Sequence, residues 1–291
     1  MNEYNIVNFG SMTEHMAKVI NHLIDKISNA IGWSIKPKEF EQAVIDANRS
    51  LLEEISKRED VNPIERAAII NNFKRYIKEY ENQLDVINIA IKHLNSNAKP
   101  DEVEEDWIVF FFDKIKLVNE EEMKIIWGKI LAGEVNEPNT YTKQFLHTIS
   151  IMDSKMAKRF LKIRSNCFFI PPKLYMFVYR SNSDNIDNGR RYQQLGISYK
   201  DIRELDNIGL IQYRHPKFFT IKKSYLQLFY GDNVIELHAK NNIIETGNVS
   251  LTDIGKQLCR ICQIEYDDNI LDICLDTWKY LGYNPIVKKL E

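Results

Sequence analysis

Two cysteines, Cys259 and Cys262, have the spacing of a zinc or redox pair. A zinc site needs further ligands in a fixed array, and only Cys274 and His238 could assist this pair. Apolar residues alternate with the two cysteines inside a predicted helix, which favours buried structural thiols. We therefore predict no metal site and no cofactor.

Carboxylates offer a second kind of chemistry. Asp232 and Glu236 lie on a predicted strand and faintly resemble the carboxylate pair of a metal-dependent nuclease. The lysine expected two residues after Glu236 is missing, because His238 stands there. Glu134 has no acid or histidine partner nearby in the sequence, so we expect it to bind a backbone or basic group.

Glycine-rich phosphate loops are absent from the sequence. Gly247 and Gly255-Lys256 come nearest, but seven residues separate these glycines, where a phosphate-binding loop has four. The dinucleotide-binding and nucleophile-elbow motifs do not occur either. We predict no catalytic residue, and the enzymatic alternative that stays open is a metal-dependent nuclease.

Basic residues indicate binding rather than catalysis. The stretch 207–231 contains no acid and places its bases beside aromatic residues. A basic aromatic hairpin of this kind can follow a phosphate backbone. The predicted nucleic-acid-binding residues are Arg214, Lys217, Lys222 and Lys223.

A second basic stretch, 154–183, has seven bases and no acid, whereas 101–137 has eleven acids and four bases. Helical spacing places Lys155, Arg159 and Lys162 on one face, and we predict that this face contacts a protein. Two interpretations stay open, because the acidic and basic segments can pair within one chain or between two copies.

The whole-chain numbers limit the class of protein. With 291 residues and 44% hydrophobic side chains, the chain can bury a sizeable core. The net charge of -2 gives no general attraction to nucleic acid or to anionic membranes. No apolar run approaches the roughly 18 residues of a membrane span, and residues 1–15 lack a signal-peptide pattern. We expect a cytoplasmic protein without a membrane partner.

Helical periodicity dominates the first half of the chain. Amphipathic helices are predicted over 12–31 and 39–56. Asn62 and Pro63 predict the cap and first turn of a helix over 63–97, which would be about 50 Å long and form the spine of a domain.

A window rich in tryptophan and phenylalanine follows and predicts a helix pair over 106–133. Trp107, Phe111 and Trp127 have the spacing of a helix–helix core, and Gly133 stands where the second helix is expected to end. A further helix is predicted over 153–163.

The pattern changes near residue 166, where aromatic and β-branched residues become dense, as is typical of strands. A capping box at Ser198 opens a short helix, more strand-like pieces follow, and the chain ends with two further helices. A helix followed by antiparallel strands and another helix is typical of a winged-helix module.

Several short motifs occur in a fixed order along the chain. They are Asp106-Trp107, Phe111-Phe112, Trp127-Gly-Lys-Ile-Leu-Ala-Gly-Glu134, Ile208-Gly-Leu-Ile211 and Leu251-Thr-Asp-Ile-Gly255. Together they resemble the bacterial domain-of-unknown-function family 2806 over most of the chain. The resemblance implies a bacterial or phage-encoded cytosolic protein without an assigned catalytic centre. Related-looking helical domains occur in abortive infection and other phage defence, so a role of that kind is also implied.

These observations predict a mostly helical α+β protein, with a helical domain at 1–165 and a winged-helix-like mixed domain at 166–291. We expect a non-enzymatic sensor or adaptor in phage defence that binds a protein partner or itself, and nucleic acid through the basic hairpin. One alternative is a nuclease that uses Asp232 and Glu236. The other is a membrane-associated toxin that acts through the helix at 12–31.

Overall fold

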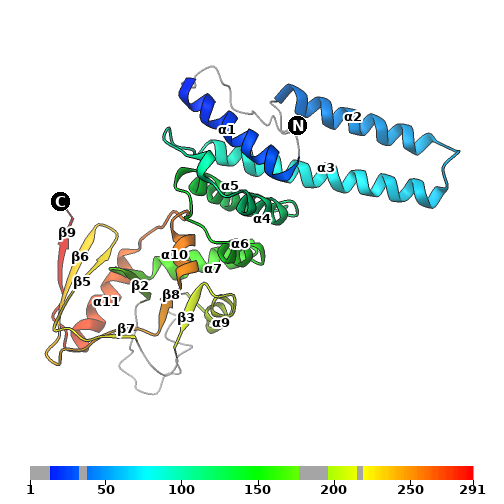
Figure 1. The fold of residues 1–291 in the computed structure, drawn as a ribbon. Helices are drawn as coiled ribbons and strands as arrows, with labels where there is room; N and C mark the ends of the chain where they lie inside the picture. Colours follow the sequence, from blue (N-terminus) through cyan, green and yellow to red (C-terminus); the bar gives the residue numbers. More distant parts are fainter. Residues whose placement is uncertain (1–13, 33–37, 177–195, 215–218, 291) are drawn as a thin grey trace. The chain divides into compact units, whose positions relative to one another are not determined.

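The chain forms two compact units, Met1–Ser150 and Ile151–Glu291. The computed structural model describes residues 14–32, 38–176, 196–214 and 219–290 (Figure 1). The sequence places a domain boundary at 165/166, and the boundary between the compact units falls earlier. The helix Ser154–Ser165 accounts for the difference, because it packs on a helix of the second unit.

Helices build the first unit. They are α1 (Glu14–Ile31), α2 (Lys38–Lys57), α3 (Pro63–Ile91), the 3-10 turn η2 (Pro100–Glu102), α4 (Glu105–Ile115), α5 (Glu121–Asn136) and α6 (Lys143–Ser150). Figure 1 shows α2 running alongside the N-terminal part of α3, while α4 and α5 lie near its C-terminal part. The helix pair predicted over 106–133 corresponds to α4 and α5.

The spine helix α3 begins as predicted and ends sooner. The Asn62 side chain accepts a hydrogen bond from the Ile64 amide at 2.9 Å, and Pro63 occupies the first turn. The helix ends at Ile91 rather than at residue 97. The Asn136 side chain explains why the helix ends there. Its amide group donates a hydrogen bond to the His93 carbonyl at 3.0 Å, and its Oδ1 accepts one from the Asn95 backbone amide at 2.8 Å.

An aromatic cluster fills the core of the first unit, as the spacing predicts. Trp107 stacks on Phe111 with ring centroids 5.0 Å apart, and Phe111 meets Trp127 edge-on at 5.3 Å. All three side chains are buried. The indole Nε1 of Trp107 donates to the Tyr141 carbonyl at 2.6 Å, so its polar group is satisfied inside the core.

Two glycines lie inside α5, so the expected helix end at Gly133 is wrong, and α5 continues to Asn136. A Cβ atom at Gly128 would lie 2.4 Å from Cγ2 of Ile89 on α3, and one at Gly133 would lie 2.8 Å from the Tyr141 ring. These glycines are required by close packing rather than by a turn.

The Glu134 carboxylate fastens the loop that follows α5. It is 3% exposed and accepts hydrogen bonds from the backbone amides of Asn139 at 2.7 Å and Tyr141 at 2.8 Å. Burial raises its pKa above the ordinary value, and the amide hydrogen bonds partly offset this rise. The expected backbone contact of Glu134 is therefore present.

The apolar face of α1 is covered within the first unit. Val19, Ile20, Leu23 and Ile27 are buried, and α1 packs against α4 and η2. The membrane-toxin alternative therefore requires α1 to leave this packing. Among the described helices, none has both the length and the apolar character that crossing a membrane demands.

The second unit mixes helices and strands. Its elements are α7 (Ser154–Ser165), β1 (Cys167–Ile170), β2 (Lys173–Met176), α9 (Tyr199–Asn207), β3 (Ile211–Tyr213), β4 (Phe219–Ile221), β5 (Tyr225–Tyr230), β6 (Asn233–His238), β7 (Ile244–Gly247), β8 (Val249–Leu251), α10 (Asp253–Cys259), α11 (Asp268–Tyr280) and β9 (Ile286–Lys289). The Ser198 capping box at the start of α9 is formed as predicted.

Seven of the described strands form one antiparallel sheet in the order β3-β8-β2-β1-β5-β6-β9, and β4 pairs with β7 separately. The prediction of a mixed α+β protein is confirmed. The sheet is larger than a simple two-stranded wing, because β2, β1, β5, β6 and β9 extend the pair that β3 forms with β8.

Candidate nucleic-acid interface

An open cleft of about 390 Å³ lies in the second unit. Its walls come from the β1–β2 turn, the end of β4, and the start of β5. The lining residues are Ile170, Pro171, Pro172, Lys173, Ile221, Lys223, Tyr225, Leu226 and Gln227. Basic, aromatic and amide side chains therefore meet around one cleft.

Strand pairing brings these segments together. Strand β1 pairs with β5 through Phe169 and Phe229, so the turn that follows β1 lies beside the start of β5. Alternation along β5 then separates the side chains, since Leu226 is buried while Tyr225 and Gln227 are exposed.

The residues that line the cleft include two lysines and no acid, while Glu236 of the neighbouring strand accepts a hydrogen bond from the Tyr225 side chain. Lys173 and Lys223 are exposed and make no ion pair with any residue that the structure describes. Tyr225 is 43% exposed, and its ring centroid lies 5.0 Å from that of His238. Two cations and one accessible aromatic ring thus share a single hollow.

The four predicted nucleic-acid-binding residues have different outcomes. Lys223 lines the cleft, and its neighbour Lys222 is exposed at the same connection. The Arg214 guanidinium lies 4.1 Å from the ring centroid of Phe219, at the other end of β4 from Ile221. Lys217 lies outside the described residues.

The three predicted protein-contacting residues lie on α7. Arg159 is engaged inside the second unit, where its Nε lies 2.8 Å from Asp201 and its Nη1 pairs with Glu204 of α9. Lys155 and Lys162 are exposed, and the Lys162 ammonium group lies close to Gly196. Arg159 thus joins two helices, and the contact of this face with a partner stays a prediction.

Of the two carboxylates in the nuclease alternative, Glu236 has a local partner. The Glu236 carboxylate accepts a hydrogen bond from Lys288 Nζ at 2.8 Å, and this contact lowers its pKa. Asp232 is exposed at the β5–β6 turn, where its carbonyl accepts from the Leu290 amide at 2.8 Å. No group of three metal-ligating side chains occurs within the described ranges.

Three of the four cysteines have raised thiol pKa values. Burial raises the pKa of Cys167 to about 12 and that of Cys259 to about 11, and the nearby Arg164 guanidinium offsets only part of each rise. Cys274 is fully buried, and its pKa is also raised by burial. Thiols held neutral in this way are poor nucleophiles.

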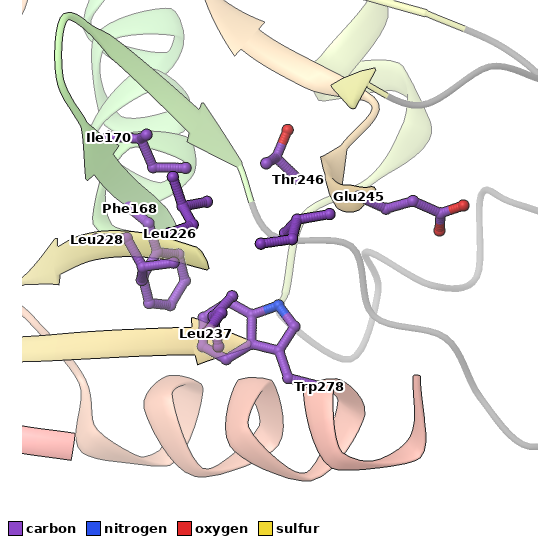
Figure 2. Close-up of a pocket in the computed structure, with 9 residues that line it drawn as sticks. Phe168, Ile170, Leu226, Leu228, Leu237, Glu245, Thr246 and Trp278 are labelled. Carbon is purple, nitrogen blue, oxygen red and sulfur yellow. The ribbon is translucent and has the colours of Figure 1, made fainter. Parts of the chain in front are cut away.

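A second hollow lies under the sheet and is part of the core. Figure 2 shows the Trp278 indole against Leu237, with Phe168 and Leu228 close by. Its volume of about 10 Å³ is at the lower limit for one water molecule. Mostly apolar side chains line it, so it offers no ligand site.

The sequence reasoning missed Lys173, Tyr225 and Gln227 as members of the same site. Lys173 belongs to the acid-free stretch 154–183, whose bases were attributed to a helix face. Tyr225 follows the Lys222–Lys223 pair closely and could have been included with it. The meeting of these residues depends on the pairing of β1 with β5.

Comparison with known proteins gives one result. A family model described as "Protein of unknown function (DUF2806)" matches residues 68–273, which include every residue that lines the cleft. No curated protein matches the chain, and no solved structure matches it.

Proposed function

The chain belongs to the DUF2806 family of proteins of unknown function, and we propose that it is a non-enzymatic interaction protein that binds single-stranded nucleic acid in the cleft. The single observation that carries the proposal is the meeting of Lys173, Lys223 and Tyr225 around one open hollow. Cations beside an accessible aromatic ring are the common elements of single-strand binding sites.

The chemistry of the walls fits a phosphate–base unit. The two ammonium groups would neutralise phosphates, and the Tyr225 ring offers a face on which a base can stack. The Gln227 side chain adds an amide that can donate to and accept from a base edge. The cleft volume falls in the usual range of small-ligand sites, about 300–1,000 Å³, so it accommodates a short segment of one strand.

A winged-helix mode of duplex binding is the finer form of the original hypothesis. It would place a helix such as α9 in the major groove. However, α9 carries three acids and two bases between Tyr199 and Asn207, so phosphates would repel it. We therefore favour the cleft over α9, and single strands over duplex.

The proposed cellular role is that of a sensor or adaptor in phage defence in the bacterial cytoplasm, for which nucleic acid would be the signal. A nuclease is less well supported, because Glu236 is occupied by Lys288. Plating efficiency of phage on cells that carry wild-type or cleft-variant protein tests the defence role. Equal protection by the wild-type and cleft-variant proteins would show that the defence role does not depend on the cleft.

The binding test uses fluorescence anisotropy with labelled single-stranded and duplex oligonucleotides between about 50 and 200 mM salt. Lys173→Glu combined with Lys223→Glu is expected to weaken single-strand binding at least about tenfold and to reduce the salt slope by about 1.4, at 0.7 per phosphate contact. Tyr225→Ala is expected to cost about 1–3 kcal/mol without changing the slope.

The matched control is Lys240→Glu combined with Lys289→Glu, which reverses two exposed charges outside the cleft. Arg214→Glu with Lys222→Glu tests whether the interface continues beyond the cleft walls. The proposal fails if binding is insensitive to salt, or if the cleft pair and the control pair weaken it equally.

A further inference from the structure

A helical arm is defined here as α2 together with residues 63–81 of α3, and the side chains of this arm that the structure describes lie outside the buried core of the first unit. Between residues 46 and 81, no side chain that the structure describes is buried, and burial on α3 begins only at Asn82. Figure 1 shows the two helices of the arm extending side by side away from α4 and α5.

The arm nevertheless carries a continuous series of large apolar side chains. Leu51 is 39% exposed and Tyr76 is 52% exposed. The half-buried members are Leu52, Ile55, Ile69, Ile70, Phe73 and Ile77. Two helices can shield only one side of each other's apolar stripe, whereas a four-helix arrangement encloses the stripes in a common core.

Charge is segregated along the arm. The tip, residues 53–66, has five acids and three bases, whereas residues 67–78 have three bases and no acid. Glu53 and Glu54 are exposed near the tip, and Lys74 and Lys78 are exposed further along α3. None of these four side chains forms an ion pair with a described residue.

We propose that two copies of this chain dimerise by antiparallel pairing of their helical arms into a four-helix bundle. A two-fold axis near Ile70 and Phe73 would place the acidic tip of each arm against the basic part of the other. The same contact then occurs twice, as a closed dimer requires. The inference rests on the proposed interaction function and names a second copy as the protein partner.

The size of the arm suits a reversible dimer. Residues 63–81 span about 28 Å, and two helices side by side are about 20 Å wide. The footprint is therefore about 560 Å² per copy, or about 1,100 Å² in total. This area is close to the lower limit for a specific interface, so dissociation should be measurable in the micromolar range.

The test measures the mass of the full-length protein by sedimentation velocity across about 1–100 µM. The wild type is expected to pass from monomer to dimer. Lys74→Glu with Lys78→Glu, and separately Glu53→Lys with Glu54→Lys, are each expected to weaken the dimer at least about tenfold. An equimolar mixture of the two variants is expected to recover the wild-type affinity, because both tip-to-base contacts are attractive in the mixed dimer.

The matched control is Lys92→Glu with Lys240→Glu, which reverses two exposed charges outside the arm and should leave the dimer intact. A wild type that stays monomeric overturns the proposal, and so does a dimer that neither charge reversal weakens. Dimerisation only after removal of residues 1–13 overturns it too, since those residues would then be what covers the arm.

Nucleic-acid binding separates this inference from the proposed function. Arm variants, measured below the dimerisation range, are expected to bind single strands like the wild-type monomer. Cleft variants are expected to remain dimeric. A wild-type protein that stays monomeric but binds single-stranded nucleic acid therefore rejects the dimer proposal and retains the proposed binding function of the cleft.

Discussion

The Glu134 carboxylate has a chemical environment that suits a structural task. Its two oxygens accept from the backbone amides of Asn139 and Tyr141, and the first of these residues has a φ of 67°. Side-chain acceptors of this kind hold a loop in a conformation that few residues adopt unaided. We therefore attribute the Ala-Gly-Glu motif to packing and loop fixation.

Replacement of Glu134 by glutamine tests this assignment. An amide has one acceptor oxygen, so one backbone N–H would face the NH2 group instead. We expect Glu134→Gln to lower the free energy of unfolding by about 1–3 kcal/mol at pH 7. Urea unfolding followed by tryptophan fluorescence measures it, with the exposed Glu81→Gln as a control that should change little.

The same variant has an expected pH dependence. Burial raises the pKa of Glu134 above 4.5, so the folded state holds this proton more tightly than the unfolded chain does. The resulting stabilisation is complete below pH 4.5 and is lost as pH rises through the folded pKa. The stability difference between wild type and Glu134→Gln should therefore grow as pH falls toward 4.5. A difference independent of pH would contradict this.

At the level of elements, the close packing of α5 against α3 depends on the lack of a side chain at Gly128. Gly128 lets the backbone of α5 approach Ile89, and its Cβ position would also lie 3.1 Å from the Val86 carbonyl oxygen. At Gly133 the nearest atoms all belong to the outer part of the Tyr141 ring, and no backbone atom is among them. The two glycines therefore differ in how readily their surroundings can accommodate a methyl group.

Alanine substitution should reveal this difference. Both changes gain about 1 kcal/mol of helix propensity. We expect overpacking to outweigh that gain at Gly128, so Gly128→Ala should lower the free energy of unfolding by about 1–3 kcal/mol. Gly133→Ala should cost less, since only a ring edge must move. Equal losses of unfolding free energy for Gly128→Ala and Gly133→Ala, measured by urea unfolding, would show that α5 can move away from α3 to accommodate the new methyl group.

At the scale of the whole molecule, the two compact units each have their own core. Trp107 and Trp127 are buried in the first unit, whereas Trp278 is buried in the second, 5.1 Å from Phe168 between ring centroids. Separate cores allow separate local unfolding, because the side chains that cooperate in one unit are not those of the other.

Hydrogen exchange measured by mass spectrometry tests this independence. Gly128→Ala is expected to speed exchange in peptides from Met1–Ser150 and to leave those from Ile151–Glu291 unchanged. The reciprocal variant, Leu228→Ala in the sheet core, should affect only the second unit. Faster exchange in both units after either change would show that they unfold as one.

Much of the helical organisation could be predicted because its signals are local. Asn62 with Pro63 predicts the start of α3, and the spacing of Trp107, Phe111 and Trp127 predicts their common core. The end of α3 could not be predicted, because no glycine or proline occurs there and the stop depends on Asn136 of another helix. Gly133 was misread for the same reason, since its close neighbour Tyr141 is not visible in α5 itself.

The sequence by itself determined the mixed α+β class, most of the helices and the family, because periodicity, capping residues and ordered motifs act over short distances, although it gave no signal for α6. Only the tertiary structure decided the cleft and gave Arg159 and Glu236 their partners. Lys173 and Tyr225 meet because β1 pairs with β5, and the registers of strand pairs far apart in sequence are set by the whole sheet.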